Sequence, residues 1–515
     1  MINNFDNKLN LTRFSIYDDY LDKKSDEVLD NDYFHSNITL SRNHLIGSEL
    51  LQNLTSNSNV KINFILIIKN VLLFYARNII YFSVWILYFI IARIGSIKNF
   101  YFHKKIVNNN IFLIQTFVDK NSIKYKSKIE DNYFRELYEY LDRNNKEYFI
   151  LPNISEDITN VKERINIINF ISKPSNIYKT EFNSLTVLDL FRIMGFILFY
   201  PIILLRYCIT IKKESKIDYL YQHDLIYTLS KSSFIPYVQL LFGKRLKEEF
   251  KNKVVKIISW NENQLIHRNF CRGISSENIT VYGCQYFIKY PSCKWMYIRE
   301  NDKKFNVLPD IILVTGKKYL PLSGSLEYRI GSPFRYRDVH NKDKQANTLD
   351  QVCILVMLPY EQIQSESILD FIYSSKYLRE LKLDIKIHPD YVHRKNFYMK
   401  RISKKWKIVD NNLDFTKYNM LITKSTGSII EFIAKGFSVL VIDDDNPLAL
   451  NPLEKHGRKI IWDYIKNSNE FSHKINLLSE SRKKSLDKIL KISDQFKSDY
   501  FNEVTEKNLK QDFNF

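Results

Sequence analysis

Short apolar runs alternate with longer amphipathic stretches through the C-terminal half of the chain, and this alternation limits the folds that the chain can adopt. The apolar runs span 352–358, 383–387, 407–409, 419–423 and 438–442. Helical patterns separate most of them, notably at 363–380 and 428–435. Strands that alternate with helices need crossover connections, which place the strands in a parallel sheet with helices on both faces. The C-terminal half is therefore predicted to form a doubly wound α/β domain.

The N-terminal half carries the same alternation. Predicted strands span 111–117, 147–152, 253–260, 279–284 and 310–316. Between the first two, apolar residues recur from Phe134 to Leu141 at the spacing of one helix face, which predicts a β-α-β unit. The predicted fold class is therefore α/β, with two Rossmann-like doubly wound domains that face a cleft.

The chain is too long for one ordinary core, because 515 residues exceed the size at which domains split. Composition and pattern predict the boundaries. They give a polar leader at 1–60, an N-terminal domain at 61–335, a C-terminal domain at 336–467 and a charged helical tail at 468–515. A polar segment that begins near Gly331 is expected to link the two domains.

Two apolar, aromatic-rich stretches interrupt the N-terminal half, at 70–95 and 192–213. Arg77 and Arg93 bracket the uncharged part of the first, and Pro201 is expected to interrupt the second. A spanning helix needs about 20 apolar residues, so both stretches fall short of a secure span. Attachment in the plane of a membrane surface is favoured, while burial in the core and true spanning stay open as alternatives.

The net charge of +19 calls for an anionic partner. The basic residues are spread along the chain without a zinc-finger spacing or an aromatic RNA-binding motif, so no nucleic-acid partner is expected.

Five cysteines form no CxxC pair, and the first residues show no secretory pattern. The expected location is the cytoplasm, with peripheral attachment to the inner face of the membrane.

Lys386, His388 and Pro389 stand at the carboxyl end of the strand predicted at 383–387. In an open parallel sheet, ligands bind outside the carboxyl ends of the strands. A lysine offers a point charge for phosphate, and a histidine offers a donor or a proton. The alternative is a surface turn that happens to be basic.

A second polar cluster follows the strand predicted at 419–423. Ser425, Thr426 and Ser428 place hydroxyls beside the free N–H groups at the start of a predicted helix, and Gly427 is expected to permit a tight turn. Such a helix start favours anions. Glu431 stands three residues after Ser428, so a capping box explains these two residues without any ligand.

These two clusters resemble the donor half of GT-B-type glycosyltransferases that build bacterial surface polysaccharides. The similarity lies in "KIHP" followed by "STGSIIEFIAKG", and is closest to sialyltransferase-like and Kdo-transferase-like families that use CMP-sugars. The resemblance implies that Lys386, His388 and Pro389 meet the nucleotide. It also implies that Ser425 and Thr426 meet its phosphate, with Gly427, Ser428 and Glu431 nearby.

The first half is similar to surface-carbohydrate biosynthesis proteins with Trp-x-Glu-x-Gln and Gly-x-Gln-His patterns. "WNENQ" supplies the first pattern, while Tyr286 replaces the usual histidine of the second. Inverting transfer needs a general base for the acceptor hydroxyl, and Glu262 in "WNENQ" is the main candidate. The alternative for Glu262 is a helix N-terminal carboxylate. His223 and Asp224 are lesser candidates, and His388 is a second possible catalytic residue.

The resemblance implies a glycosyltransferase that moves a sugar from a nucleotide-activated donor to a surface polysaccharide, lipopolysaccharide or lipid-linked glycan. The domain at 61–335 then faces the acceptor, and the domain at 336–467 binds the nucleotide-sugar. A glycerol-phosphate or polyol-phosphate transferase is the rival enzyme, and a non-catalytic membrane-associated scaffold is the rival without activity. "VIDDDNP" at 441–447 is interpreted as a solvated acidic loop, so neither a metal nor a cofactor is expected.

Overall fold

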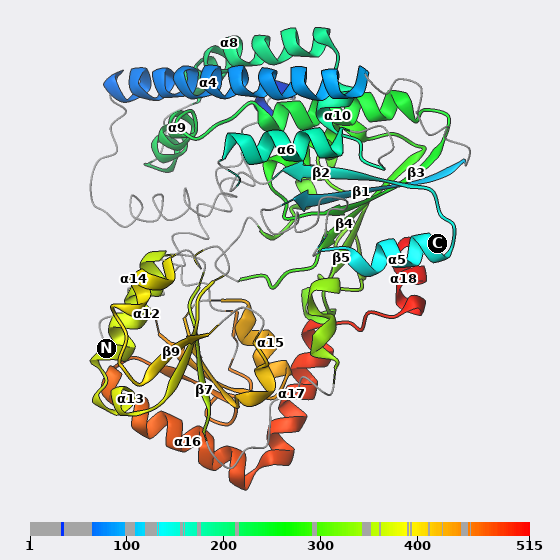
Figure 1. Ribbon diagram of the computed structural model, residues 1–515. Coiled ribbons are helices and arrows are strands. Elements are labelled where there is room, and N and C mark those ends of the chain that lie inside the picture. The colour runs from blue at the N-terminus through cyan, green and yellow to red at the C-terminus, as the bar shows by residue number, and fades with distance from the viewer. Residues whose placement is uncertain are drawn as a thin grey trace.

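The structure is a computed structural model, and its secondary structure divides into two parallel sheets with helices around them (Figure 1). The described residues are 32–35, 64–97, 109–118, 131, 133–154, 158, 160–172, 177–211, 216–290, 296–341, 352–359, 362–388, 391, 394–409, 413–424, 426–443, 452–453 and 455–515.

The first sheet belongs to the N-terminal half and has the strand order β2-β1-β3-β4-β5-β6. Its strands are β1 (Asn110–Val118), β2 (Tyr148–Ile154), β3 (Val254–Trp260), β4 (Ile279–Gln285), β5 (Ile311–Val314) and β6 (Glu327–Ile330). All neighbouring pairs are parallel. Helix α5 (Arg135–Arg143) joins β1 to β2, which confirms the predicted β-α-β unit.

The second sheet has the order β12-β11-β10-β7-β8-β9 and is also parallel. Its strands are β7 (Ile354–Met357), β8 (Leu383–Lys386), β9 (Trp406–Val409), β10 (Met420–Thr423), β11 (Ser438–Ile442) and β12 (Trp462–Ile465). Its helices include α12 (Gln362–Ser374), α13 (Lys376–Glu380), α14 (Lys395–Met399) and α15 (Ser428–Ala434). Two doubly wound sheets, with apolar helices added to the N-terminal half, confirm the predicted fold class.

The two apolar stretches form α4 (Phe64–Ile97) and α8 (Val187–Thr210), which lie side by side at the edge of the N-terminal domain farthest from the second sheet (Figure 1). Helix α8 continues through Pro201, so the expected interruption is wrong. The buried ring of Pro201 faces the core, where the surrounding packing keeps the helix intact. The other helices of this domain are α6 (Val161–Ile171), α7 (Glu181–Ser184), α9 (Lys216–Thr228), α10 (Ile235–Glu249) and α11 (Leu265–Ile274).

Most of the predicted leader lies outside the described residues. Its described part, α2 (Asp32–His35), packs on the N-terminal domain, because the ring of Tyr33 meets Phe196 edge-on at 5.5 Å and Tyr237 at 5.2 Å. A short segment predicted to be loose is therefore folded against α8 and α10.

The predicted helical tail comprises α16 (Phe471–Lys484), α17 (Leu486–Tyr500) and α18 (Glu506–Phe513). Helix α17 packs against α15 of the second domain, and α18 lies against the first sheet (Figure 1). Phe513 is fully buried there, and the Lys256 ammonium donates to the carbonyl oxygens of Phe513 and Asn514. These last helices therefore tie the two domains together.

Candidate functional site

The segment after β4 and the start of α15 approach each other closely between the two domains. A Cβ added to Gly427 would lie 3.1 Å from the Cβ of Ile288 and 3.1 Å from the hydroxyl of Tyr290. Ile288 is buried among side chains of the second domain. This contact brings the carboxyl end of β4 next to the carboxyl end of β10, and we call the surrounding region the interdomain junction.

Glu262 stands two residues beyond β3 and is half-buried at the carboxyl edge of the first sheet. Its Oε1 accepts a hydrogen bond from the indole Nε1 of Trp260 at 2.9 Å, and its Oε2 accepts one from Nε2 of Gln264 at 2.7 Å. The "WNENQ" motif therefore orients its own carboxylate. Each carboxylate oxygen keeps a further lone pair, so the group remains able to accept a proton.

Arg335 is a charged residue between the two sheets in the sequence that the sequence analysis did not single out. It lies in the 3₁₀ helix η8 (Phe334–Val339), within the segment predicted to be a linker, and its side chain is exposed. The pKa of Arg335 is raised, first by Tyr336 and then by Tyr133, Glu431 and Glu262.

Lys386 is the last residue of β8 and lies at the carboxyl edge of the second sheet. Burial lowers the pKa of Lys386, and the Glu431 carboxylate opposes that effect, so the two side chains interact across the carboxyl edge of the second sheet. The Oε1 atom of Glu431 also accepts from the buried Lys435 ammonium at 2.6 Å. His388 is half-buried two residues beyond β8, and its carbonyl oxygen accepts from the Tyr391 amide at 2.9 Å.

The start of α15 differs from the predicted capping box. Gly427 is the N-cap residue, Ser428 is the first helical residue, and Glu431 pairs with Lys435 instead of reaching back. Gly427 has helical dihedral angles, φ −60° and ψ −25°, so its backbone needs no special turn. The requirement for glycine comes instead from the close approach of Ile288 and Tyr290.

The hydroxyl of Thr426 accepts from the Ser428 amide at 3.4 Å, and Lys424 is buried just before it. Ser425 and Pro389 lie outside the described residues, as do Asp444 and Asp445. The structure therefore places Lys386 and Glu262 at the carboxyl edges of the two sheets, and Thr426, Gly427 and Ser428 where the two domains touch.

Three further positions of interest lie elsewhere. Tyr286 is fully buried, and a Cβ at Gly331 would lie 2.4 Å from its hydroxyl, so Tyr286 belongs to the core. His223 lies on α9, which packs against α4 and α8, and the side chain of Asp224 is outside the described part. These observations give no support to a role of His223 or Asp224 beside Glu262.

The acidic segment after β11 is represented by Asp443, whose Oδ2 lies 3.2 Å from the ammonium of Lys466. Among the described residues, no group of three His, Cys, Asp or Glu side chains is placed to hold a metal ion. Metal independence stays a prediction, with its own test below.

Lys289, four residues beyond β4, is a second residue that sequence reasoning missed. It is 3% exposed, and its ammonium lies over the rings of Tyr297, Tyr319 and Tyr328 at 5.5, 5.8 and 5.9 Å from their centroids. Burial lowers the pKa of Lys289 to about 7. A lysine in this setting is half protonated at neutral pH.

No protein family model matches the chain, and no curated protein sequence matches it. Several solved structures resemble it weakly. The UDP-GlcNAc 2-epimerase of Methanocaldococcus jannaschii, solved with UDP-GlcNAc and UDP, is 10% identical with a TM-score of 0.37, over 74% of this chain and 92% of that chain. The glycotransferase of kitacinnamycin is 8% identical with a TM-score of 0.37, over 76% and 96%.

The wall teichoic acid polymerase TagF is 10% identical with a TM-score of 0.37, over 83% of this chain and 92% of that chain. Similarity at this level assigns neither a family nor an activity. The fold class rests on the topology of the chain itself, which has the two parallel sheets of a GT-B-type protein with their carboxyl ends brought together at the interdomain junction.

Proposed function

We propose that the protein is a glycosyltransferase that moves a sugar from a nucleotide-activated donor to a hydroxyl of a glycan acceptor. The observation that carries the proposal is the meeting of the carboxyl ends of the two sheets at the interdomain junction, where Gly427 lies against Ile288 and Tyr290. Glu262 stands at this edge of the first sheet, and Lys386 ends a strand of the second. A carboxylate on one side and cations on the other suit a reaction in which a proton leaves the acceptor and a phosphate leaves the donor.

Glu262 would act as the general base for the acceptor hydroxyl. Trp260 and Gln264 hold its carboxylate in one orientation, and positioning of this kind is needed for proton transfer in the transition state. Attack by the activated hydroxyl on the opposite face of the sugar from the leaving group inverts the anomeric centre.

Lys386 and Arg335 would bind the phosphate that departs with the nucleotide. Both carry positive charge near the strand ends where ligands of open α/β sheets bind, and preorganised charge of this kind stabilises a developing phosphate anion. Thr426 and Ser428 would add hydroxyl donors to the same phosphate. The CMP type of donor and the surface-polysaccharide or lipid-linked type of acceptor follow from the motif resemblance, and they are part of this proposal.

The donor site is tested by replacing Lys386 with Met. We expect CMP, CDP, UDP or GDP at about one hundred times its Kd to stabilise the parent protein by about 2.7 kcal/mol in a thermal-shift experiment. The variant should bind the same nucleotide about ten- to hundredfold more weakly, because a charge-assisted hydrogen bond contributes about 1.5–3 kcal/mol. His388→Ala should also weaken binding.

Lys382→Met is the matched control, because Lys382 is exposed at the opposite end of the same strand. It should bind nucleotide like the parent. If Lys386→Met and His388→Ala both bind like the parent, the donor site lies elsewhere. A parent that binds none of the four nucleotides would favour the scaffold, and a product that carries a glycerol-phosphate or polyol-phosphate unit would favour the rival transferase.

Transfer is predicted to survive removal of divalent metals. The cations expected to stabilise the leaving phosphate are Lys386 and Arg335, so a metal ion is not required for that role. The measurement is the transfer rate after incubation with EDTA and after addition of Mg²⁺ or Mn²⁺. Loss of transfer with EDTA and recovery with either metal would contradict the prediction and direct attention to the segment at 443–445.

A further inference from the structure

Helices α4 and α8 expose a broad apolar surface at the edge of the N-terminal domain. Leu72, Ile80 and Leu87 of α4 are 62%, 61% and 46% exposed, and Phe191 and Ile202 of α8 are 64% and 47% exposed. The two helices lie side by side, and we call their exposed apolar residues together the apolar platform (Figure 1). Both helices are long and apolar enough to cross a membrane by length and composition alone.

The opposite face of α4 is packed onto the protein along most of its length. Buried residues run from Asn70 to Ala92, a distance of about 33 Å at 1.5 Å per residue. At mid-helix, Arg77 donates to the carbonyl oxygens of Ser230 and Ser232, and Asn78 accepts from the Phe234 amide at 3.0 Å. A helix fixed to a folded domain over this length suits attachment in the plane of a bilayer.

The charge of the platform suits an anionic surface. Helix α4 contains no acidic residue, and Asp189 is the one acid of α8. The Asp189 side chain is 1% exposed and paired with Arg192 at 2.9 Å and Arg245 at 2.7 Å. Lys69 and Arg206 are exposed on α4 and α8. The described side chains of both helices therefore present basic groups to solvent without an exposed carboxylate.

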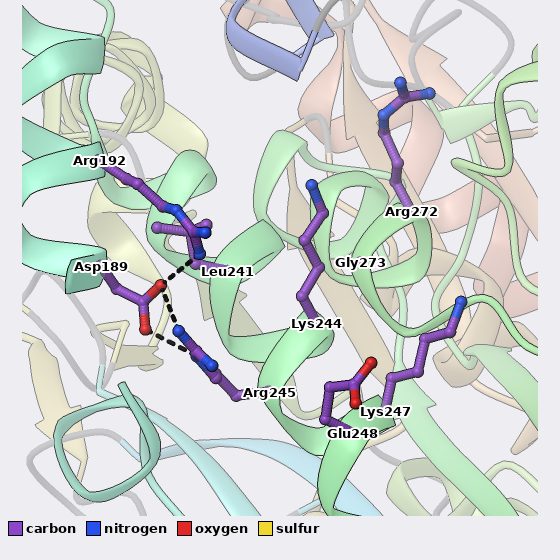
Figure 2. A pocket seen from close by; sticks show the side chains of 9 residues that line it. All are labelled: Asp189, Arg192, Leu241, Lys244, Arg245, Lys247, Glu248, Arg272 and Gly273. Carbon is purple, nitrogen blue, oxygen red and sulfur yellow. Dashed lines mark hydrogen bonds and ion pairs between the residues drawn. The ribbon is translucent and has the colours of Figure 1, made fainter. Parts of the chain in front are cut away.

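A basic pocket of about 340 Å³ adjoins the first turns of α8 (Figure 2). Its basic lining residues are Arg192, Lys244, Arg245, Lys247 and Arg272. Figure 2 shows Lys244, Lys247 and Arg272 across the pocket from the Asp189–Arg245 pair.

Carboxylates only partly balance the charge of this pocket. Asp189 and Glu248 line it, and Asp32 of α2 pairs with Lys244 at 2.6 Å and Arg272 at 3.0 Å. Among the residues that the structure describes, five cations against three carboxylates leave an excess of two positive charges. Lys247 donates to a neutral group there, the carbonyl oxygen of Ser275 at 2.7 Å.

We propose that the apolar platform docks on an anionic lipid bilayer and that the basic pocket takes the phosphate of a lipid headgroup at its edge. Phe191, in the turn that holds Arg192, is exposed on the platform, so a lipid whose acyl chain lies beside Phe191 brings its phosphate to the pocket. Apolar side chains in the acyl boundary with cations at the phosphate level are the pattern of interfacial membrane proteins. The inference does not depend on the transfer reaction, since vesicle binding needs neither donor nor acceptor.

The test is flotation of the full chain with vesicles of roughly seven parts phosphatidylcholine to three parts phosphatidylglycerol. The platform variant Leu72→Gln/Leu87→Gln/Phe191→Gln should bind at least about one hundredfold more weakly, because three apolar side chains lose burial in the bilayer. The pocket variant Arg192→Gln/Lys247→Gln should bind about ten- to thirtyfold more weakly, since each cation near an anionic surface contributes about 1 kcal/mol.

Matched controls carry the same changes on other surfaces. Leu322→Gln/Ile363→Gln/Leu490→Gln alters three exposed apolar residues, and Lys483→Gln/Lys488→Gln removes two exposed charges from the helices of the second domain. Both controls should float like the parent.

Four results would overturn the proposal. Absence of vesicle binding, or retention of the cellular protein in membranes through alkaline carbonate, would exclude in-plane docking. A dimer in sedimentation velocity that the platform variant dissociates would assign the platform to a second copy of the chain. Equal binding to pure phosphatidylcholine vesicles would exclude the headgroup role of the pocket.

Discussion

Replacing Glu262 by Gln should lower the rate of sugar transfer about 10²- to 10⁴-fold, the usual contribution of a general base. The amide has nearly the volume of the carboxylate and can still accept from the indole of Trp260, while the Gln264 amide can turn to present its oxygen. The site should therefore keep its shape and lose its proton acceptor. The loss should appear in kcat, because the donor nucleotide is proposed to bind on the other domain.

The measurement is the steady-state rate with donor in excess, together with nucleotide binding by thermal shift. Glu277→Gln is the matched control, because Glu277 is exposed just before β4, at the opposite edge of the same sheet. It should transfer like the parent, and both variants should bind nucleotide like the parent. Transfer by Glu262→Gln within about twofold of the parent would show that another group is the base.

Most of the fold could be predicted because its central strands are continuous apolar runs. Strand β11 is buried along its whole length and apolar after Ser438, and β1 is buried at most positions and apolar from Ile111 to Ile114. The edge strands β6 (Glu327–Ile330) and β12 (Trp462–Ile465) escaped prediction for a physical reason. Each is four residues long and contains charged side chains, and the buried Asp463 of β12 is tolerated only because Arg458 and Lys474 pair with it at 3.1 and 2.5 Å.

The candidate site could be predicted where a charged residue stands at the carboxyl end of a strand. Lys386 and Glu262 could be found in this way, because parallel strands deliver their carboxyl ends to one edge of each sheet. Arg335 could not, since it lies in η8, within a polar segment whose pattern predicted a linker. The role of Gly427 was likewise misread from its local sequence, because its constraint is a contact with Ile288, which is 139 positions away along the chain.

The burial of Lys289 should make the stability of the protein depend on pH. A lysine has a pKa near 10.5 in the unfolded chain, and burial lowers it to about 7 in the folded protein. Between these two values the unfolded state binds the proton and the folded state does not, so stability rises with pH across this window and is lowest below pH 7. The shift corresponds to roughly 4–5 kcal/mol. The faces of Tyr297, Tyr319 and Tyr328 favour the ammonium and reduce that cost.

Lys289→Met keeps the length of the aliphatic chain and removes the charge. We expect it to stabilise the protein at pH 6 by about 2–4 kcal/mol, and the advantage should shrink steadily toward pH 9 because the parent lysine then folds in its neutral form. Melting temperatures of both proteins at pH 6, 7.5 and 9 provide the measurement. Lys303→Met, which alters an exposed lysine of the same domain, should show no such trend. A Lys289→Met protein that is less stable than the parent by the same amount at every pH would instead mean that the folded protein holds Lys289 as a charged group with a stabilising partner.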